Sequence, residues 1–325
     1  MRYAYYPGCS LTRSARAYAV STEAIAGPLG LELVEVEDWN CCGATEYIAI
    51  NKSAAYALVG RNLALATAIE DVDTLAAPCS ACYLNLKKVD RYMGEYPDLN
   101  QRTNSALAAG GLAYAPGTLH VKHLLDVITE DIGAEAVAGH VTQPLAGIKL
   151  APYYGCLIAR PELNDQPSHD TEHPIHLDDL LSALGAEVVD YPVKTNCCGG
   201  HMAQISAPTA YDLIGKLIGA AVKAGADAIV TICPMCQLNL DAYQTQVNRH
   251  LGTDFKMPIL YFTQMIGLAM GMKPADLGFG QELVSGKPML AKVGLPVHDP
   301  AGPVRKRRSR RQDPSLPMPG SRGER

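Results

Sequence analysis

The chain has 325 residues, of which 48% are hydrophobic, a length and composition typical of a globular protein with more than one domain. Its most apolar region, residues 217–232, is interrupted by Lys223 and Asp227, so we expect no transmembrane span. Residues 301–325 have a net charge of +6 and the rest of the chain −11, and an acidic body argues against nucleic acid as a partner. The chain starts with a strand-like run and lacks the apolar core of a signal peptide, which predicts a cytoplasmic location.

Strand-like and helix-like runs alternate along the first half of the chain. The predicted strands are residues 2–6, 31–37 and 73–77. The predicted helices include residues 16–27, residues 54–69 and a helix-like run at 120–130. Each predicted strand is followed by cysteines, which are Cys9, then Cys41 and Cys42, then Cys79 and Cys82.

The second half repeats this order. Predicted strands at residues 148–153, 186–191 and 228–232 are followed by Cys156, by Cys197 and Cys198, and by Cys233 and Cys236. A helix-like run at 261–270 matches the one at 120–130. All ten cysteines fall within the repeated motif, five in each copy. A repeat of this length indicates a duplicated domain, and we predict a first domain at 1–145 and a second at 146–280.

Alternating strands and helices predict the α/β class, with two tandem homologous α/β domains that have mainly parallel sheets and a pseudo-twofold relation. In a parallel sheet the C-terminal ends of the strands share one edge, where ligands bind, so we expect the cysteines to converge there. Cys79 and Cys233 are expected to open helices, whose first N–H groups stabilise thiolates. Residues 281–325, rich in Pro, Gly and Arg, are predicted to be a flexible basic tail.

Five thiols per copy exceed the four that a zinc ion or a cubane cluster uses, and they predict an unusual iron–sulfur cluster. The adjacent Cys41 and Cys42 point in different directions and would bind different irons more easily than the same one. Structural zinc is the main alternative, while disulfides are disfavoured in a reducing cytosol. There is no Gly-x-Gly-x-x-Gly sequence after a strand, so no flavin or NAD site is predicted in this chain.

The pattern Cys-x31-Cys-Cys-Gly-x35-Cys-x-x-Cys, followed by Cys-x40-Cys-Cys-Gly-x33-Cys-x-x-Cys, resembles the CCG cysteine-rich domain family. With two copies and no other module, the chain is similar to the B-type subunit of heterodisulfide reductase and its bacterial relatives over residues 1–275. The resemblance implies two non-cubane [4Fe-4S] clusters that face each other across a disulfide substrate. The cluster ligands would be two sets, Cys9, Cys41, Cys42, Cys79 and Cys82, and Cys156, Cys197, Cys198, Cys233 and Cys236.

The same resemblance implies a redox subunit that cleaves or forms a disulfide or sulfur bond within a larger complex. Gly43 stands where methanogen enzymes often have Pro, so the chain looks more like the bacterial branch, which includes complexes that oxidise sulfur carried by a lipoate-binding protein. The implied partners are a ferredoxin-like iron–sulfur subunit and a flavoprotein subunit. Two alternatives are an electron-transfer subunit of a lactate- or glycolate-type flavin dehydrogenase and a zinc-stabilised assembly protein.

One residue outside the cysteines is a candidate for catalysis. His201 follows the second Cys-Cys-Gly-Gly sequence and is placed to donate a proton to a leaving thiolate, while packing in the turn is its alternative role. Asn40 and Asn196 precede the two cysteine pairs, and we expect them to cap the turns.

Overall fold

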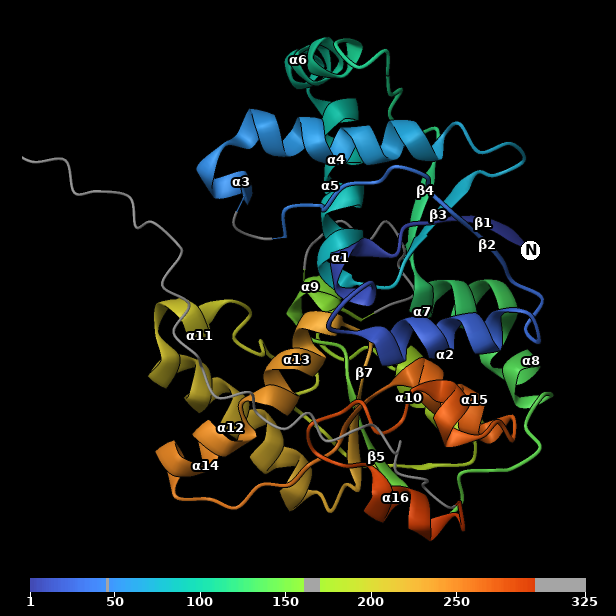
Figure 1. Cartoon of the computed structure of the whole chain (residues 1–325), viewed down its shortest axis with the longest axis vertical. Coiled ribbons are helices and arrows are strands. Elements are labelled where there is room, and N and C mark those ends of the chain that lie inside the picture. Colours follow the sequence, from blue (N-terminus) through green and yellow to red (C-terminus); the bar gives the residue numbers. More distant parts are fainter. Residues whose placement is uncertain (45–46, 161–169, 296–325) are drawn as a thin grey trace, which may run out of the picture.

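The computed structural model describes residues 1–44, 47–160 and 170–295, and in this part of the chain the strands form two sheets of four parallel strands each (Figure 1). The first sheet has the order β2-β1-β3-β4, with β1 Arg2–Tyr5, β2 Glu32–Glu35, β3 Thr74–Ala77 and β4 His120–His123. The second has the order β6-β5-β7-β8, with β5 Lys149–Tyr153, β6 Glu187–Val188, β7 Ala228–Thr231 and β8 Ile259–Tyr261. The matching orders confirm the prediction of two tandem α/β units.

Helices connect these strands in both units. Those of the first unit are α1 Gly8–Leu11, α2 Arg16–Ala26, α3 Tyr47–Ile50, α4 Lys52–Ala66, α5 Ser80–Glu95, α6 Pro97–Ala108, α7 Leu124–Asp126, the π-helix η1 Val127–Gly133 and α8 Ala134–Ala138. Those of the second are α9 Cys156–Ala159, α10 His176–Ala183, α11 Met202–Ile205, α12 Ala207–Lys223, α13 Pro234–Ala242, α14 Gln244–Leu251, α15 Phe262–Ala269, the 3-10 helix η2 Pro274–Leu277 and α16 Lys287–Lys292. None of the helices in the described ranges is sufficiently long and apolar for a membrane span.

The centre of each sheet is buried on both faces. Every residue of β3 and of β7 is buried, as expected for an inner parallel strand covered by helices on two sides. In both sheets the strand that starts the unit lies next to these buried strands, with Ala4 opposite Leu75 and Ala151 opposite Ile229. From the two central strands the connections run to opposite edges of the sheet. The topological switch point therefore lies between β1 and β3 in the first sheet and between β5 and β7 in the second.

Two predictions differ from the structure. The sequence predicts a helix at residues 120–130, but β4 occupies His120–His123 because this short segment pairs with β3 along its whole length. The predicted flexible tail begins too early, since residues 281–295 are described and α16 buries Met289 and Leu290. Residues 296–325, with the basic run of the tail, lie outside the described residues.

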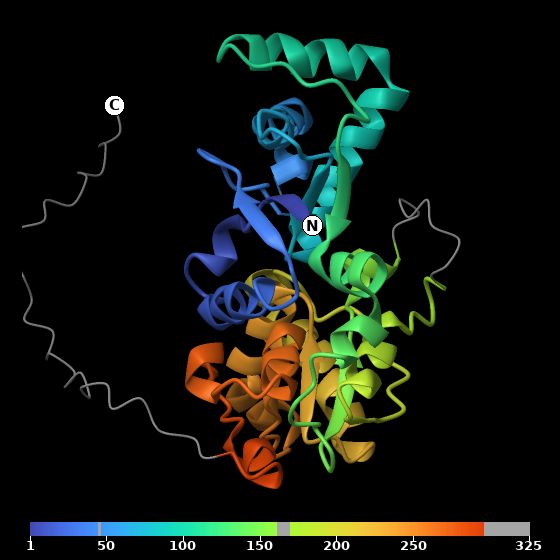
Figure 2. The ribbon, with the colours of Figure 1, turned by 90° about the vertical axis from the view of Figure 1, so that its right-hand side faces the viewer.

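Helices α2 and α15 join the two units. Figures 1 and 2 show α2, from the first unit, lying against the second unit. The rings of Tyr18 and Tyr261 stack with centroids 4.4 Å apart, and the hydroxyls of Ser21 and Thr263 lie 2.6 Å from each other. Tyr18 also donates a hydrogen bond of 3.2 Å to the carbonyl of Ile232. All of these contacts are buried, so the relative position of the two units is set by specific contacts.

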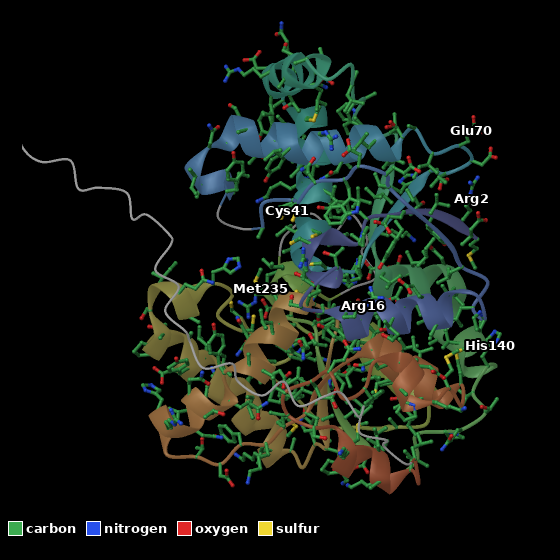
Figure 3. All side chains as sticks on the ribbon, viewed as in Figure 1. Arg2, Arg16, Cys41, Glu70, His140 and Met235 are labelled. Atoms are coloured by element: carbon green, nitrogen blue, oxygen red, sulfur yellow. The ribbon has the colours of Figure 1, made fainter. Side chains whose placement is uncertain are left out.

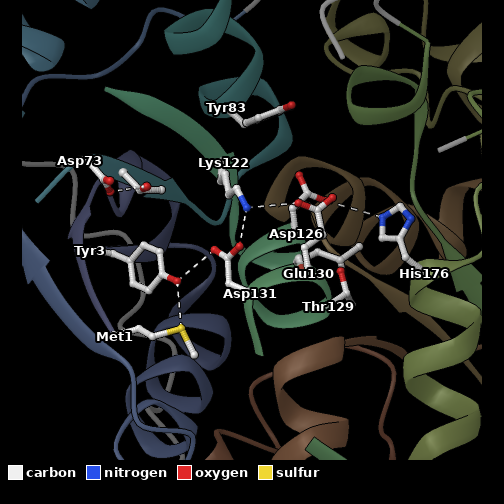
Figure 4. A network of polar contacts seen from close by, with 12 residues as sticks. Met1, Tyr3, Asp73, Tyr83, Lys122, Asp126, Thr129, Glu130, Asp131 and His176 are labelled. Carbon is white, nitrogen blue, oxygen red and sulfur yellow. Dashed lines mark hydrogen bonds and ion pairs between the residues drawn. The ribbon is translucent and has the colours of Figure 1, made fainter. Parts of the chain in front are cut away.

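A polar network extends from the N-terminal strand to the second unit (Figure 4). Lys122 forms ion pairs with Glu130 at 3.2 Å and with Asp131 at 2.5 Å. Asp131 also accepts a hydrogen bond from the Tyr3 hydroxyl at 2.9 Å. Beside this network, Asp126 Oδ1 lies 3.8 Å from His176 Nε2 of the second unit, so the polar contacts cross the same boundary as α2.

Candidate metal centre

The cysteines gather at the C-terminal edges of the two sheets. Cys9 follows β1 and Cys79 follows β3, so both lie at the switch point of the first sheet. Cys156 follows β5 and Cys233 follows β7 at the switch point of the second sheet. The predicted convergence of the thiols is therefore confirmed, and it follows from the parallel topology rather than from sequence spacing.

Two helices begin directly at these edges. Cys79 is the N-cap residue of α5, and Cys233 is the N-cap residue of α13, as predicted. Cys82 and Cys236 lie in the first turns of the same helices. The unpaired N–H groups of a helix start favour negative charge, so both Cys-x-x-Cys segments hold their sulfurs where thiolates are stabilised.

The ten sulfurs form one continuous row. In the first unit, the sulfur of Cys41 lies 3.6 Å from that of Cys9, and the sulfur of Cys42 lies 3.3 Å from that of Cys82. Thiol–thiol contacts then lead from Cys82 to Cys79 and across the boundary to Cys233. The row continues in the second unit through Cys236, Cys198, Cys197 and Cys156. We call the contact between Cys79 and Cys233 the junction.

The contacts within the row divide the thiols into proton donors and acceptors. Contacts with the thiols of Cys42 and Cys9, together with the hydrogen bond from the Gly43 N–H at 3.4 Å, lower the pKa of Cys41 to about 2. In the second unit, the thiols of Cys156 and Cys198 and the Gly199 N–H at 3.3 Å lower the pKa of Cys197 to about 2.

At the junction, hydrogen bonds from Cys236 and then Cys79 lower the pKa of Cys233 well below its ordinary value. Thiolates are the form of cysteine that binds metals, so the row is already prepared for that role at both pairs and at the junction.

Matching side chains hold the loops that carry the cysteine pairs. Asn85 donates hydrogen bonds to the carbonyls of Cys42 at 3.1 Å and Ala44 at 2.5 Å. Asn239 does the same in the second unit, to Cys198 at 3.3 Å and Gly200 at 2.7 Å. Sequence reasoning did not assign a role to these residues, although the repeated Leu-Asn-Leu sequences around them carry the signal.

The residues before the cysteine pairs are fixed in the same way. The hydroxyls of Tyr6 and Tyr153 donate to the carbonyls of Asn40 and Asn196, each at 2.7 Å. The Asn40 side chain donates to the carbonyls of Cys41 at 3.0 Å and Leu58 at 3.1 Å, which differs from the predicted turn cap, where the side-chain oxygen would accept from a backbone N–H. The geometry of each pair is thus set by side chains of its own unit.

Two glycines make room for the sulfurs. Gly8 and Gly155 have φ angles of +73° and +72°, and a Cβ at either position would lie 3.0 Å from the sulfur of Cys82 or Cys236. A donor set of five thiols with such a cradle fits an iron–sulfur cluster in each unit. Among the residues that the structure describes, no three Cys, His, Asp or Glu side chains are arranged to hold a single metal ion.

The model of the CCG family, a cysteine-rich domain, matches residues 3–87 and 150–241, which are the two units that carry the thiols. The chain belongs to this family. The CCG protein is 34% identical to the 8-methylmenaquinol:fumarate reductase membrane anchor subunit of Wolinella succinogenes, over 87% of its own length and 96% of that protein. It is 32% identical to the B-type subunit of ferredoxin:CoB-CoM heterodisulfide reductase of Methanosarcina mazei, over 88% of this chain and 95% of that subunit.

Among solved structures, a hypothetical protein from Helicobacter pylori has the same fold as the CCG protein, with a TM-score of 0.71 and 15% identity. The match covers 87% of this chain and 52% of that one, so the chain spans about half of the solved protein.

A cavity of about 240 Å³ opens beside the second set of thiols. Its lining includes all five cysteines of that set, and around them His201, Met202, Ile205 and Met235. His201 precedes α11, so the structure places this predicted residue within reach of the second site. Figure 3 shows Met235 and Cys41 on the same side of the molecule, where the two units meet.

Proposed function

We propose that this CCG protein is the iron–sulfur redox subunit of a heterodisulfide reductase-like complex and that it cleaves or forms a disulfide or another sulfur–sulfur bond. The observation that carries the proposal is the row of ten sulfurs, five from each unit, that is continuous across the boundary. Membership of the CCG family and the similarity to the B-type subunit of a heterodisulfide reductase support the same class of activity.

In this proposal each set of five cysteines holds one non-cubane [4Fe-4S] cluster. When bound, two such clusters supply one electron each, and cleavage of a disulfide to two thiols requires two electrons and two protons. The chain's own contribution is to hold the two sets at opposite sides of the junction. The Asn85 and Asn239 side chains fix the two cysteine-pair loops, so the ligands keep their positions while charge changes.

His201 is the proposed source of one proton. It lines the cavity of the second site together with four apolar or sulfur-containing side chains, Leu157, Met202, Ile205 and Met235. A disulfide that enters this cavity would leave a thiolate there, and a protonated imidazole can donate to its sulfur. The His201→Gln variant should keep its iron but lose most of its turnover, whereas equal loss from His201→Gln and from the surface control His140→Gln would contradict this role.

The partners proposed for the complex are a ferredoxin-like iron–sulfur subunit and a flavoprotein subunit, with a lipoate-binding protein as sulfur carrier. We place the complex in the cytoplasm, where reducing conditions keep thiols available for metal binding. Because Gly43 resembles the bacterial branch of the family, sulfur oxidation, in which the same site would run in the reverse direction, is one form of this proposal.

Metal analysis of the anaerobically purified chain tests this proposal. We expect a brown protein with about eight iron atoms per chain, the sum that two four-iron clusters require. Cys42→Ser and Cys198→Ser should each lose about half of the iron if each set holds its own cluster. The proposal would be refuted by a colourless protein that contains one or two zinc atoms, and in which neither the wild type nor any variant shows the absorbance of an iron–sulfur cluster.

A second candidate follows from the similarity to a subunit of a menaquinol:fumarate reductase. In that case the same two sites would pass electrons between a quinol and an organic-acid flavoenzyme, and no disulfide would be cleaved. The two candidates are separated by mixing the dithionite-reduced chain with oxidised lipoamide or with menadione. If the reduced chain converts lipoamide to its dithiol, with one lipoamide reduced per two electrons, the disulfide-cleaving function is favoured. If menadione reoxidises the chain and lipoamide does not, the electron-transfer function is favoured.

A further inference from the structure

A buried histidine lies where the two units and their thiols meet. His123 ends β4 and has no exposed surface. Its Nδ1 accepts a hydrogen bond of 3.1 Å from the N–H of Leu125, so His123 caps the start of α7. Because Nδ1 is the acceptor, a neutral ring carries its proton on Nε2. The ring is therefore neutral on geometric grounds, and burial lowers the pKa of His123, in agreement with this.

The proton on Nε2 has no acceptor among the described residues. The carbonyls of Pro78 and Ile232 lie near enough to the ring to favour its protonated form, but neither makes a hydrogen bond of ordinary geometry with Nε2. These two residues directly precede Cys79 and Cys233, which form the junction, so the ring lies close to the Cys233 side chain. A buried N–H donor without a partner destabilises a fold, so its presence here calls for an acceptor at the junction.

The matching position in the second unit, at the end of the fourth strand of the sheet, has no unsatisfied donor. Tyr261 ends β8 and caps α15, which is the place that His123 has in the first unit. Its hydroxyl donates to the side-chain oxygen of Gln237 at 3.3 Å. The carbonyl of Ile232 accepts from Tyr18, on the side of α2. The unpaired donor is therefore a property of His123 itself and not of the repeated fold.

We propose that the Nε2–H of His123 donates a hydrogen bond to the sulfur of Cys233 at the junction once the thiols carry their cluster. Bound to the cluster, the Cys233 sulfur stays a thiolate, which accepts hydrogen bonds more strongly than a thiol does. Beside the junction, Ser80 and His123 both carry a buried polar atom with no hydrogen-bond partner among the described residues, and the ring nitrogen is the one that lies near Cys233 across the boundary. A donor to cluster sulfur stabilises the more negative, reduced state. His123 thus raises the reduction potential of the second site. This inference rests on the proposed function, because it requires a bound cluster.

Two substitutions separate the two ring nitrogens. His123→Asn keeps an acceptor for the Leu125 N–H but has no donor at the place of Nε2. His123→Gln places its amide N–H near the position of Nε2 but removes the acceptor for the α7 cap. The measurements are iron content, the thermal midpoint and an EPR-monitored redox titration of the full chain.

We expect His123→Asn to keep its iron and its thermal midpoint and to shift one midpoint potential to a more negative value. His123→Gln should keep the potential of the wild type and lose thermal stability. An unshifted potential in iron-loaded His123→Asn, or the same shift in both variants, would overturn the inference. Wild-type protein without iron would instead overturn the proposed function, and the inference with it.

A further measurement keeps His123 in place, so the inference can be tested even if both substituted variants fail to fold. Protein labelled with 15N-histidine should show a nitrogen hyperfine coupling to a reduced cluster by pulsed EPR. The coupling should persist in His201→Gln, since the hydrogen bond comes from the junction and not from the cavity. An iron-loaded protein in which His201→Gln abolishes the coupling would overturn the assignment to His123.

Discussion

Asn239 offers a sharp test of how the second cysteine pair is held. Its side chain is 5% exposed and donates to the carbonyls of Cys198 at 3.3 Å and Gly200 at 2.7 Å. Replacement by alanine leaves two buried acceptors without a donor, and each such loss costs about 1–3 kcal/mol. Because one of the two bonds is long, we expect Asn239→Ala to lower the free energy of unfolding by about 2–4 kcal/mol.

The same substitution should also release iron, because the loop that carries Cys197 and Cys198 loses its anchor. We expect Asn239→Ala to hold about half of the wild-type iron, with the first site intact. Iron content by colorimetric assay and unfolding of the metal-free chain in urea measure the two effects. Asn85→Ala should act on the first site in the same way.

A matched control lies in the same unit. Asn248 bridges a loop by donating to the carbonyl of Phe255 at 2.9 Å and accepting from its N–H at 2.7 Å, away from the thiols. Asn248→Ala should destabilise the chain without loss of iron. Equal iron loss in Asn239→Ala and Asn248→Ala would show that general destabilisation, and not loop geometry, governs metal binding. Full iron in a destabilised Asn239→Ala would refute the anchoring role.

Three further outcomes follow from the structure. Gly155→Ala puts a Cβ 3.0 Å from the sulfur of Cys236 at a φ of +72°, so it should lower the free energy of unfolding by about 1–2 kcal/mol and the iron at the second site by half. Gly225→Ala is the control, because it has a φ of +74° but no atom near its Cβ; it should destabilise the chain by a similar amount and keep all iron. A double-mutant cycle of Ser21→Ala and Thr263→Val should give a coupling of about 1 kcal/mol in urea unfolding, and additive effects would mean that their 2.6 Å contact does not join the units. Removal of iron with a chelator under reducing conditions should leave the far-UV circular dichroism nearly unchanged, because both sheets have buried centres of their own; a collapse of the signal would show that the metal is required for the fold.

The local pattern of the sequence was sufficient for the inner strands and for helix α2, while the predicted helix at 54–69 covers most of α4 but ends three residues too late. The predicted strand at 73–77 and helix at 16–27 agree with β3 and α2 within one residue at each end, because β3 is a short run buried on both faces and α2 buries one face at helical spacing. β4 was missed because His120–His123 alternates polar and apolar residues over only four positions, and its strand conformation depends on pairing with β3. In the part of the tail up to residue 295, α16 forms because Met289 and Leu290 are buried against the second unit.

The ten cysteines, their division into two sets of five and their place after parallel strands were determined by the sequence alone, since a duplicated motif and the α/β alternation are local and periodic features. The tertiary structure decided which sulfurs touch across the two units. Cys79 and Cys233 meet only because α2 packs on α15 and brings the ends of β3 and β7 together. The same packing buries His123 beside the junction. Contacts between residues so distant in the chain depend on the docking of two complete cores, and no local pattern in either copy specifies them.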